Sequence, residues 1–285
     1  MLVNLNDILY DAKKNKYAVG GFNTIDISSA RAVIAAAEEQ KCPVILMFAE
    51  VHKDIVPLEI IGELMVRLAK EASVPVCVHL DHGTDFNFIE KALKIGFTSV
   101  MYDGSALPFE ENIANTAKVV ALAHSMGATV EAELGQLPGR ETGGSEDVNE
   151  TESNASNLYT NPKLAKEFIW KTNADALAIA FGTAHGVYAK EPVLDYDIIH
   201  KVEKEVSVPL VMHGGSGISE VGFKTAIQNG ISKINYFTYM SVAGAEAVKE
   251  YINSAQKGYY HELIGKAYDG IKEDCKKAMV IFENK

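Results

Sequence analysis

The chain has 285 residues, of which 47% are hydrophobic, so it is long enough to bury a large core. Its 38 acidic residues outnumber its 27 basic residues, and no block of lysine or arginine occurs, which argues against nucleic acid or an anionic membrane as a partner. The three cysteines are widely spaced, which indicates a reducing compartment, and no stretch approaches the ~20 apolar residues of a membrane span. We therefore expect a cytoplasmic protein.

The first segment, residues 5–12, carries apolar side chains at helical spacing and predicts a helix that covers the N-terminal mouth of the fold. Eight short runs rich in β-branched residues follow, and amphipathic helical patterns separate them. The runs are 18–22, 44–48, 76–80, 99–102, 129–134, 176–180, 210–213 and 233–237. Helix caps are expected at Ser28 or Ser29, at Asn161 and at Ser219, and residues after about 258 predict a further terminal helix.

Alternating strands and helices imply parallel pairing, and eight units with nearly uniformly apolar strands predict a closed (β/α)8 barrel, the TIM barrel of the α/β class. An open doubly wound sheet is the alternative. We find no internal boundary, so residues 1–285 are expected to form a single domain.

Residues 135–157 are rich in Gly, Ser, Asn and acid and lack periodicity. Because they follow the fifth predicted strand, we interpret them as an active-site lid, with a flexible ornament as the alternative.

Polar residues stand at the ends of the predicted strands, where a barrel makes them converge in space. They are Asn23, Asp81, His82, Gly83, Asp103, Glu131, Glu133, His185, His213 to Gly217, Asn235 and Thr238. Because one end of the barrel collects all of them, we expect a single site there.

Three histidines of this set, His82, His185 and His213, follow three different strands. Imidazoles suit three corners of a tetrahedral Zn²⁺ site whose fourth position stays open for substrate. Any one histidine alone is more simply explained as a buried or loop residue, so the convergence carries the argument. His79 is expected in the core or behind the site, and the position of His52 is left undecided.

A glycine-rich turn at 214–217 lets backbone amides approach an anion without a Cβ in the way. Barrel enzymes often bind phosphate in the loops after strands seven and eight, where this turn and residues 235–238 fall. The sequence therefore predicts a phosphate site, and a tight turn without a ligand is the alternative.

Six longer motifs stand in order along the chain: HLDHG (79–83), MYDGSALPFEENI (101–113), VEAELG (130–135), FGTAHGVY (181–188), LVMHGGSGIS (210–219) and KIN (233–235). Together they closely resemble the class II, zinc-dependent ketose-bisphosphate aldolases, from about Asn4 to Thr238. The resemblance implies a (β/α)8 barrel and a homodimer or homotetramer. It also implies reversible cleavage of a phosphorylated ketose to dihydroxyacetone phosphate and an aldehyde, through an enediolate stabilised by the metal.

The resemblance also implies roles for individual residues. Asp81 would be the acid/base that serves the cleaved C4 hydroxyl, and a monovalent cation, Na⁺ or K⁺, would lie near the phosphate. The catalytic Zn²⁺ ligands would be His82, His185 and His213, and a second divalent site would use Asp103 and Glu133. The substrate and phosphate set would be Asn23, Gly186, Gly214, Gly215, Ser216, Asn235, Tyr236, Phe237 and Thr238.

Within the predicted lid, Glu146 resembles the mobile glutamate that moves the proton at the nucleophilic carbon, although Glu141 aligns as an alternative. Three other functions remain in competition. A zinc-dependent barrel hydrolase would need the same histidines but not the phosphate turn. A Schiff-base aldolase would need a buried lysine at the C-terminal end of a strand, whereas Lys233 is predicted at the start of its strand. A non-catalytic sugar-phosphate binding protein would not need the metal ligands.

The sequence departs from the family where the distal end of the substrate would lie. Fructose-type members carry an aspartate two residues after the asparagine of the KIN motif, whereas this chain has Phe237. The family's distal phosphate-binding arginine is also missing, because no arginine follows Arg140 and the corresponding stretch begins at Lys257. We therefore predict that a ketose 1-phosphate, or a ketose with another distal group, is a better substrate than fructose 1,6-bisphosphate. The alternative is an ordinary fructose- or tagatose-bisphosphate aldolase in which these substitutions are neutral, with Lys257 or Arg140 of the predicted lid compensating for the missing arginine.

Overall fold

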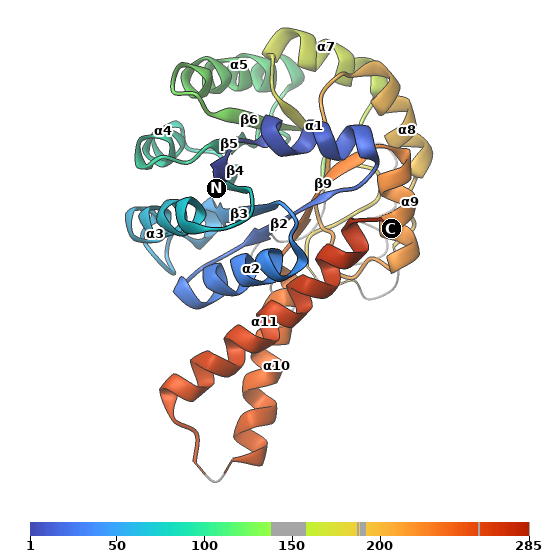
Figure 1. The fold of residues 1–285 in the computed structure, drawn as a ribbon. Coiled ribbons are helices and arrows are strands. Elements are labelled where there is room, and N and C mark those ends of the chain that lie inside the picture. Colours follow the sequence, from blue (N-terminus) through green and yellow to red (C-terminus); the bar gives the residue numbers. More distant parts are fainter. Residues whose placement is uncertain (138–157, 187, 189–191, 256, 285) are drawn as a thin grey trace.

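Eight parallel strands close into a barrel in the computed structural model, which describes residues 1–137, 158–186, 188, 192–255 and 257–284 (Figure 1). They are β2 (Val19–Asn23), β3 (Val44–Ala49), β4 (Val76–Gly83), β5 (Ser99–Tyr102), β6 (Thr129–Leu134), β7 (Ala176–Ile179), β8 (Leu210–Met212) and β9 (Ile231–Tyr236). Each pairs with the next in order, and the ring closes between β9 and β2. A short strand, β1 (Leu2–Val3), adds to β4. The predicted barrel is confirmed, and the open doubly wound alternative is wrong.

Helices surround the barrel and join its strands (Figure 1). They are α1 (Leu5–Asn15), α2 (Ile27–Gln40), η1 (Glu50–His52), α3 (Leu58–Glu71), α4 (Phe86–Ile95), α5 (Phe109–Ser125), α7 (Pro162–Thr172), α8 (Tyr196–Glu205), α9 (Glu220–Asn229), α10 (Thr238–Ser254) and α11 (Tyr260–Phe282). In the described part of the chain, no helix is both long and apolar enough to cross a bilayer.

Two of the three expected helix caps are confirmed. Asn161 accepts hydrogen bonds from the first turn of α7, and Ser219 caps α9. The prediction of Ser28 or Ser29 for α2 was wrong, because Asp26 caps this helix. Its carboxylate accepts from the Ser29 backbone N–H while the Ser29 hydroxyl accepts from the Asp26 backbone N–H, a reciprocal capping box.

The N-terminal mouth of the barrel is covered by α1, which lies across it (Figure 1). The buried face of α1 packs on alternate residues of the strands, which point into the barrel because side chains alternate along a strand. This interior cluster consists of Leu5, Ile8, Leu9, Ala12, Val19, Ile45, Met47, Cys77, Ala176, Ala178 and Val211. The lower half of the barrel is therefore a sealed apolar core.

The C-terminal helices extend beyond the ring. From Thr238, α10 runs away from the barrel, and α11 returns antiparallel to it, so that the pair forms a projecting hairpin (Figure 1). The far end of α11 packs against α2 and the start of β2, where the Ala18 N–H donates to the Phe282 carbonyl at 2.9 Å.

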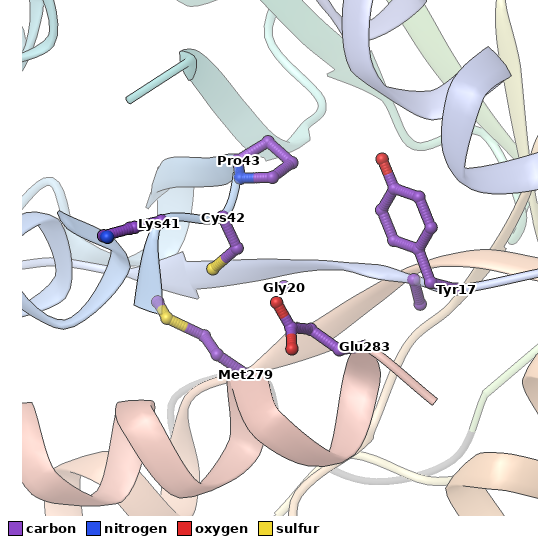
Figure 2. A pocket seen from close by; sticks show the side chains of 8 residues that line it. Tyr17, Gly20, Lys41, Cys42, Pro43, Met279 and Glu283 are labelled. Carbon is purple, nitrogen blue, oxygen red and sulfur yellow. The ribbon is translucent and has the colours of Figure 1, made fainter. Parts of the chain in front are cut away.

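A cavity of about 150 Å³ lies beside this contact (Figure 2). Its walls include Cys42 and Met279, whose sulfur atoms both face it, together with the start of β2. It therefore lies at the N-terminal half of the barrel wall, away from the carboxyl ends of the strands.

Candidate active site

A pocket opens at the carboxyl ends of the strands, opposite α1. Twelve residues line it: Asn23, Asp81, His82, His185, Gly186, Gly214, Gly215, Ser216, Asn235, Tyr236, Phe237 and Thr238. All nine residues that the sequence assigned to substrate and phosphate are among them. They come from β2, β4, β9 and the loops after β7 and β8, so the closed barrel alone brings them together.

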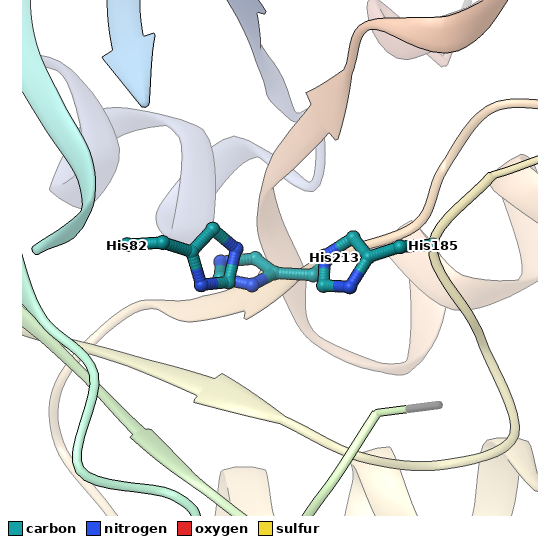
Figure 3. A group of neighbouring side chains, drawn as sticks. All are labelled: His82, His185 and His213. Carbon is teal, nitrogen blue, oxygen red and sulfur yellow. The ribbon is translucent and has the colours of Figure 1, made fainter. Parts of the chain in front are cut away.

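Three imidazoles meet at this pocket: His82 and His185 line it, and His213 is buried next to them. His82, His185 and His213 approach one another from separate segments, and Figure 3 shows the rings gathered around one point. The centroids of the His82 and His213 rings lie 4.6 Å apart, and the other two separations are 5.0 and 5.9 Å. Each ring offers a nitrogen atom within 4.8 Å of the others. This set suits a metal that prefers nitrogen ligands.

His82 has an unusual backbone conformation. Its φ of 47° lies in the left-handed region, which residues with a Cβ adopt infrequently. The pairing of β4 with β5 shifts register between Leu80 and Gly83, so His82 sits in a local irregularity of the sheet. Its Nδ1 lies 2.9 Å from Asp103 Oδ2, which fixes the ring. Although burial alone raises the pKa of Asp103, its bond to His82 holds that pKa well below the ordinary value.

His213 is completely buried and lies between two carboxylates. Its Nε2 is 2.8 Å from Glu131 Oε1, and its Nδ1 is 3.1 Å from Glu133 Oε2. Burial lowers the pKa of His213, but these two carboxylates outweigh burial and raise it to about 9. Burial, and next the charge of Asp103, raise the pKa of Glu133. The two carboxylates therefore make the space beside this ring attractive to a cation.

Two buried atoms of this cluster lack a hydrogen bond. His213 Nδ1 and Glu133 Oε2 face each other, but their geometry does not satisfy either atom. Burying such polar atoms without a partner is costly, so a ligand between them is expected. Among the described residues, two triads lie close enough to hold a metal ion: His82, His185 and His213, and His82, Asp103 and Glu133. The residues present therefore fit a divalent cation.

Asp81 is held by two carboxamides beside the histidines. Asn23 Nδ2 donates to one carboxylate oxygen at 2.8 Å, and Asn235 Nδ2 donates to the other at 3.0 Å. Asp81 is only 2% exposed. Burial raises its pKa, but the opposing charges of His82 and Lys233 hold the pKa far below the ordinary value. The carboxylate is therefore a fixed hydrogen-bond acceptor at neutral pH.

Close contacts in the turn at residues 214–217 leave no room for a side chain at Gly214. Gly214 has a φ of 64°, and a Cβ there would collide with the Ala184 carbonyl. Tyr188 joins the two loops, because its hydroxyl accepts from the Ala184 N–H at 2.7 Å and donates to the Gly214 carbonyl at 2.9 Å. Gly186 also has a positive φ, of 101°, and a Cβ built there would meet nothing within 4 Å. The space in front of these loops is open to a ligand.

One wall of the pocket ends at the start of α10. The N-cap residue, Phe237, makes no side-chain hydrogen bond to this helix, but the Tyr239 N–H in its first turn donates to Ser216 Oγ at 3.3 Å. The Phe237 ring lies 5.0 Å from the ring of His52, which resolves the undecided position of that histidine: it is buried behind the pocket wall. Lys257 lies in the turn at the far end of the hairpin, after a helix about 25 Å long.

Sequence reasoning misplaced two polar groups that lie behind the pocket, Lys233 and Glu131. Lys233 was placed at the start of its strand, but β9 begins at Ile231, so Lys233 is an interior position with no exposed surface. Its ammonium group lies 2.6 Å from Glu131, which is buried below the rim rather than on it. His79 is in the core as expected, with Nδ1 2.8 Å from Ser99 Oγ. Tyr188 carried no distinguishing sequence signal, because its role depends on two loops meeting.

The predicted lid lies mostly outside the described residues. Of the segment 135–157, the structure describes only residues 135–137. Glu146, its alternative Glu141, and Arg140 fall in the remainder, so their predicted roles stay predictions.

Comparison with known proteins agrees with the geometry. The family described as "Fructose-bisphosphate aldolase class-II" matches residues 3–285. The chain belongs to the class II fructose-bisphosphate aldolase family. A "Probable fructose-bisphosphate aldolase" of Bacillus subtilis is 40% identical over 276 residues, which cover 95% of this chain and 94% of the relative. The "Uncharacterized protein YdjI" of Escherichia coli is 44% identical over 249 residues, or 86% and 87% of the two chains.

Solved structures show the same relationship. The crystal structure titled as the YdjI aldolase from Escherichia coli K12 superposes with a TM-score of 0.87 and 37% identity, covering 99% of this chain and 97% of that one. Membership in this aldolase family makes the protein a carbon–carbon lyase and implies a divalent metal and a sugar-phosphate substrate. The predicted family and enzyme class are thereby confirmed.

Proposed function

We propose that this class II aldolase is zinc-dependent and reversibly cleaves a ketose 1-phosphate to dihydroxyacetone phosphate and an aldehyde. The observation that carries the proposal is the meeting of three imidazoles beside a clamped carboxylate and an open glycine-rich turn. A hydrolase or a simple binding protein would have no use for this whole arrangement, and the aldolase relatives weigh against both.

His82, His185 and His213 would hold the catalytic ion. Three neutral imidazoles are the ligand set that zinc uses in many catalytic sites, with a further position left for substrate. When bound, the ion supplies Lewis acidity toward the oxygen atoms of the substrate and favours the negative charge that develops during cleavage. Asp103 and Glu133, with His82, form the second triad and are proposed as an alternative divalent site.

Asp81 would exchange a proton with the C4 hydroxyl. A general base needs an oxygen at a fixed place within hydrogen-bonding reach of that proton, and the clamps from Asn23 and Asn235 provide such a place. The low pKa of Asp81 keeps it ionised and ready to accept. Glu146, or else Glu141, is proposed to move the proton at C3 of dihydroxyacetone phosphate from the lid.

The phosphate of the ketose would bind between Gly186, Gly214 to Ser216 and the start of α10. The glycines leave backbone amides uncovered, and the N-terminus of α10, whose N-cap residue Phe237 makes no side-chain hydrogen bond, favours an anion. A monovalent cation, Na⁺ or K⁺, is proposed beside the same backbone. The cytoplasmic location and the homodimer or homotetramer also stay predictions.

The preference for a ketose 1-phosphate rests on the distal wall, the side of the pocket at Phe237 where the end of the substrate away from the 1-phosphate would lie. Phe237 lines the pocket and packs on His52, so this wall offers an aromatic surface where a carboxylate stands in fructose-type members. Lys257 is too far along the hairpin to reach a substrate in the pocket of its own chain. Among the described residues, no arginine borders the pocket to grip a second phosphate.

Metal dependence and substrate class can be tested together. Purified protein, before and after exhaustive chelation, would be assayed for release of dihydroxyacetone phosphate from a panel of ketose mono- and bisphosphates. We expect activity on at least one ketose phosphate, its loss on chelation, and its return with Zn²⁺. Full activity of metal-free protein would refute zinc dependence. Borohydride reduction in the presence of substrate should trap no adduct, whereas a labelled lysine would indicate a Schiff base.

A further inference from the structure

Behind the metal-ligand candidate His213 lies a chain of charged groups that reaches into the barrel. Lys233 has no exposed surface, and its ammonium donates to Glu131 Oε2 at 2.6 Å. The other oxygen of Glu131 lies 2.8 Å from His213 Nε2. A lysine three residues into an interior strand thus connects, through one carboxylate, to the ring buried next to the pocket.

The donors and acceptors in this chain have a fixed direction. A lysine ammonium has only donors, so Glu131 must accept from Lys233. With Oε2 accepting from the ammonium, Oε1 accepts from His213, and the proton between them belongs to Nε2. The other ring nitrogen, Nδ1, is then turned toward Glu133, whose Oε2 lies 3.1 Å away.

We infer that Glu131 is a positioning residue that fixes the ring of His213 with Nε2 protonated and Nδ1 presented to the metal. The inference rests on the proposed metal site. Glu131 supplies the acceptor, and Lys233 balances the buried charge of that carboxylate, so that a neutral acceptor would not need the lysine.

Stability alone does not explain this pair. Removing two charges from water costs several kcal/mol each, and replacement of a buried ion pair by apolar residues is often neutral or stabilising. Most other side chains of the interior below the pocket are apolar, including Ile45, Cys77 and Val211, although His79 and Ser99 are also buried there. His79 does not share the task, since its Nε2 lies 3.8 Å from Glu131 and makes no hydrogen bond. The charged pair therefore needs another reason, and the contact with His213 provides one.

Two double variants separate positioning from charge burial. Both remove the two charges, but only Glu131→Gln/Lys233→Met keeps an acceptor, the amide oxygen, for His213 Nε2–H. Glu131→Leu/Lys233→Met has none. The zinc dissociation constant of each would be measured by competition with a chromophoric chelator. His213→Ala sets the level expected without this ligand, and Ile45→Ala controls for a destabilised interior that leaves the polar chain intact.

We expect Glu131→Gln/Lys233→Met and Ile45→Ala to bind zinc within about threefold of the wild type. We expect Glu131→Leu/Lys233→Met to bind about 10–100-fold more weakly, the usual effect of losing the partner of a metal-binding histidine. Equal zinc affinity in the two double variants would overturn the inference, because the acceptor would then be irrelevant.

A second measurement needs no metal and neither of the double variants. Imidazole ¹H–¹⁵N correlation spectra of the metal-free protein should contain a protected Nε2–H signal that His213→Ala removes. If the wild type lacks this signal, the inferred ring orientation is wrong. Should wild-type protein bind zinc no better than His213→Ala, the proposed function fails, and the spectra still decide the orientation of the ring.

Discussion

The two ends of the barrel are built from the same strands and have opposite contents. At the amino ends, side chains such as Val19 and Ile45 meet Leu9 of α1 in an apolar cluster. At the carboxyl ends, four to six residues further along, the strands present Asn23, Asp81 and their neighbours. The strands are therefore divided along their length into a half that holds the fold together and a half that carries chemistry.

This division predicts which substitutions should cost stability and which should cost activity. In the lower half, each side chain contributes through burial, so its loss should cost stability and leave the chemistry unchanged. In the upper half, polar groups are held by one another and by loops, so their loss should cost activity and leave the fold unchanged. Substitutions in each half can test that separation.

The largest effect is expected for His185→Ala. His185 lies in a loop above the barrel and is partly exposed, so its removal leaves the core intact. We expect zinc binding to collapse and activity to be abolished, while the far-UV circular dichroism and melting temperature stay near the wild-type values. His200→Ala, on the exposed face of α8, is the matched control and should behave as wild type. Global unfolding of the His185 variant would mean that the two halves are not separable.

Asp81→Asn should keep the metal and lose cleavage. The carboxamide can replace the carboxylate between Asn23 and Asn235, because the buried Oδ1 atoms of both lack partners and either amide can rotate to accept. The variant has no base for the C4 hydroxyl, so kcat should fall by ~10²–10⁴-fold. Zinc content and kcat would be measured beside Asp269→Asn on the exposed face of α11. A kcat within threefold of wild type would remove Asp81 from the mechanism.

In the lower half, Leu9→Ala should lower stability and spare catalysis. Leu9 is fully buried between α1 and the barrel, and such truncations cost ~2–5 kcal/mol of the free energy of unfolding. Urea denaturation would measure that change, and kcat per folded molecule should match the wild type. Tyr10→Ala, on the exposed side of the same helix, should cost far less. A drop in kcat for Leu9→Ala would show that packing at the N-terminal mouth of the barrel affects catalysis in the pocket.

The smallest effect concerns the distal wall. A ketose 1-phosphate should be cleaved with higher kcat/KM than fructose 1,6-bisphosphate. Because Phe237→Asp restores a hydrogen-bond acceptor, this variant should have a smaller difference in kcat/KM between the two substrates. A tenfold preference for fructose 1,6-bisphosphate in the wild-type protein, equivalent to about 1.4 kcal/mol, would contradict the substrate prediction and leave the aldolase assignment in place.

Most of the fold and much of the site could be predicted from the sequence. Buried parallel strands are continuous apolar runs, and a barrel gathers whatever follows them, which is why the sequence alone predicts that His82 and His213 lie together. The strand start was misplaced although Asn229 and Gly230, a turn signal, directly precede β9, and the depth of Lys233 runs against expectation because lysine is seldom fully buried. The cap of α2 was predicted at Ser28 or Ser29, and Asp26, an equally good cap residue just before them, was not considered. The positions of the lid residues, including Glu146, could not be predicted, because residues 135–157 show no periodic pattern.

The hydroxyl of Tyr188 joins the loop that carries His185 to the turn that begins at Gly214. An ion at the imidazole and an anion at the turn therefore draw on the same ordered pair of loops. The ligand that binds first bears the entropic cost of ordering the two loops. The second ligand then binds to loops that are already ordered. By thermodynamic reciprocity, each ligand then strengthens the binding of the other to the same degree. We expect inorganic phosphate to tighten zinc binding in the wild type, and a Tyr188→Phe protein that shows the same gain would rule out this linkage.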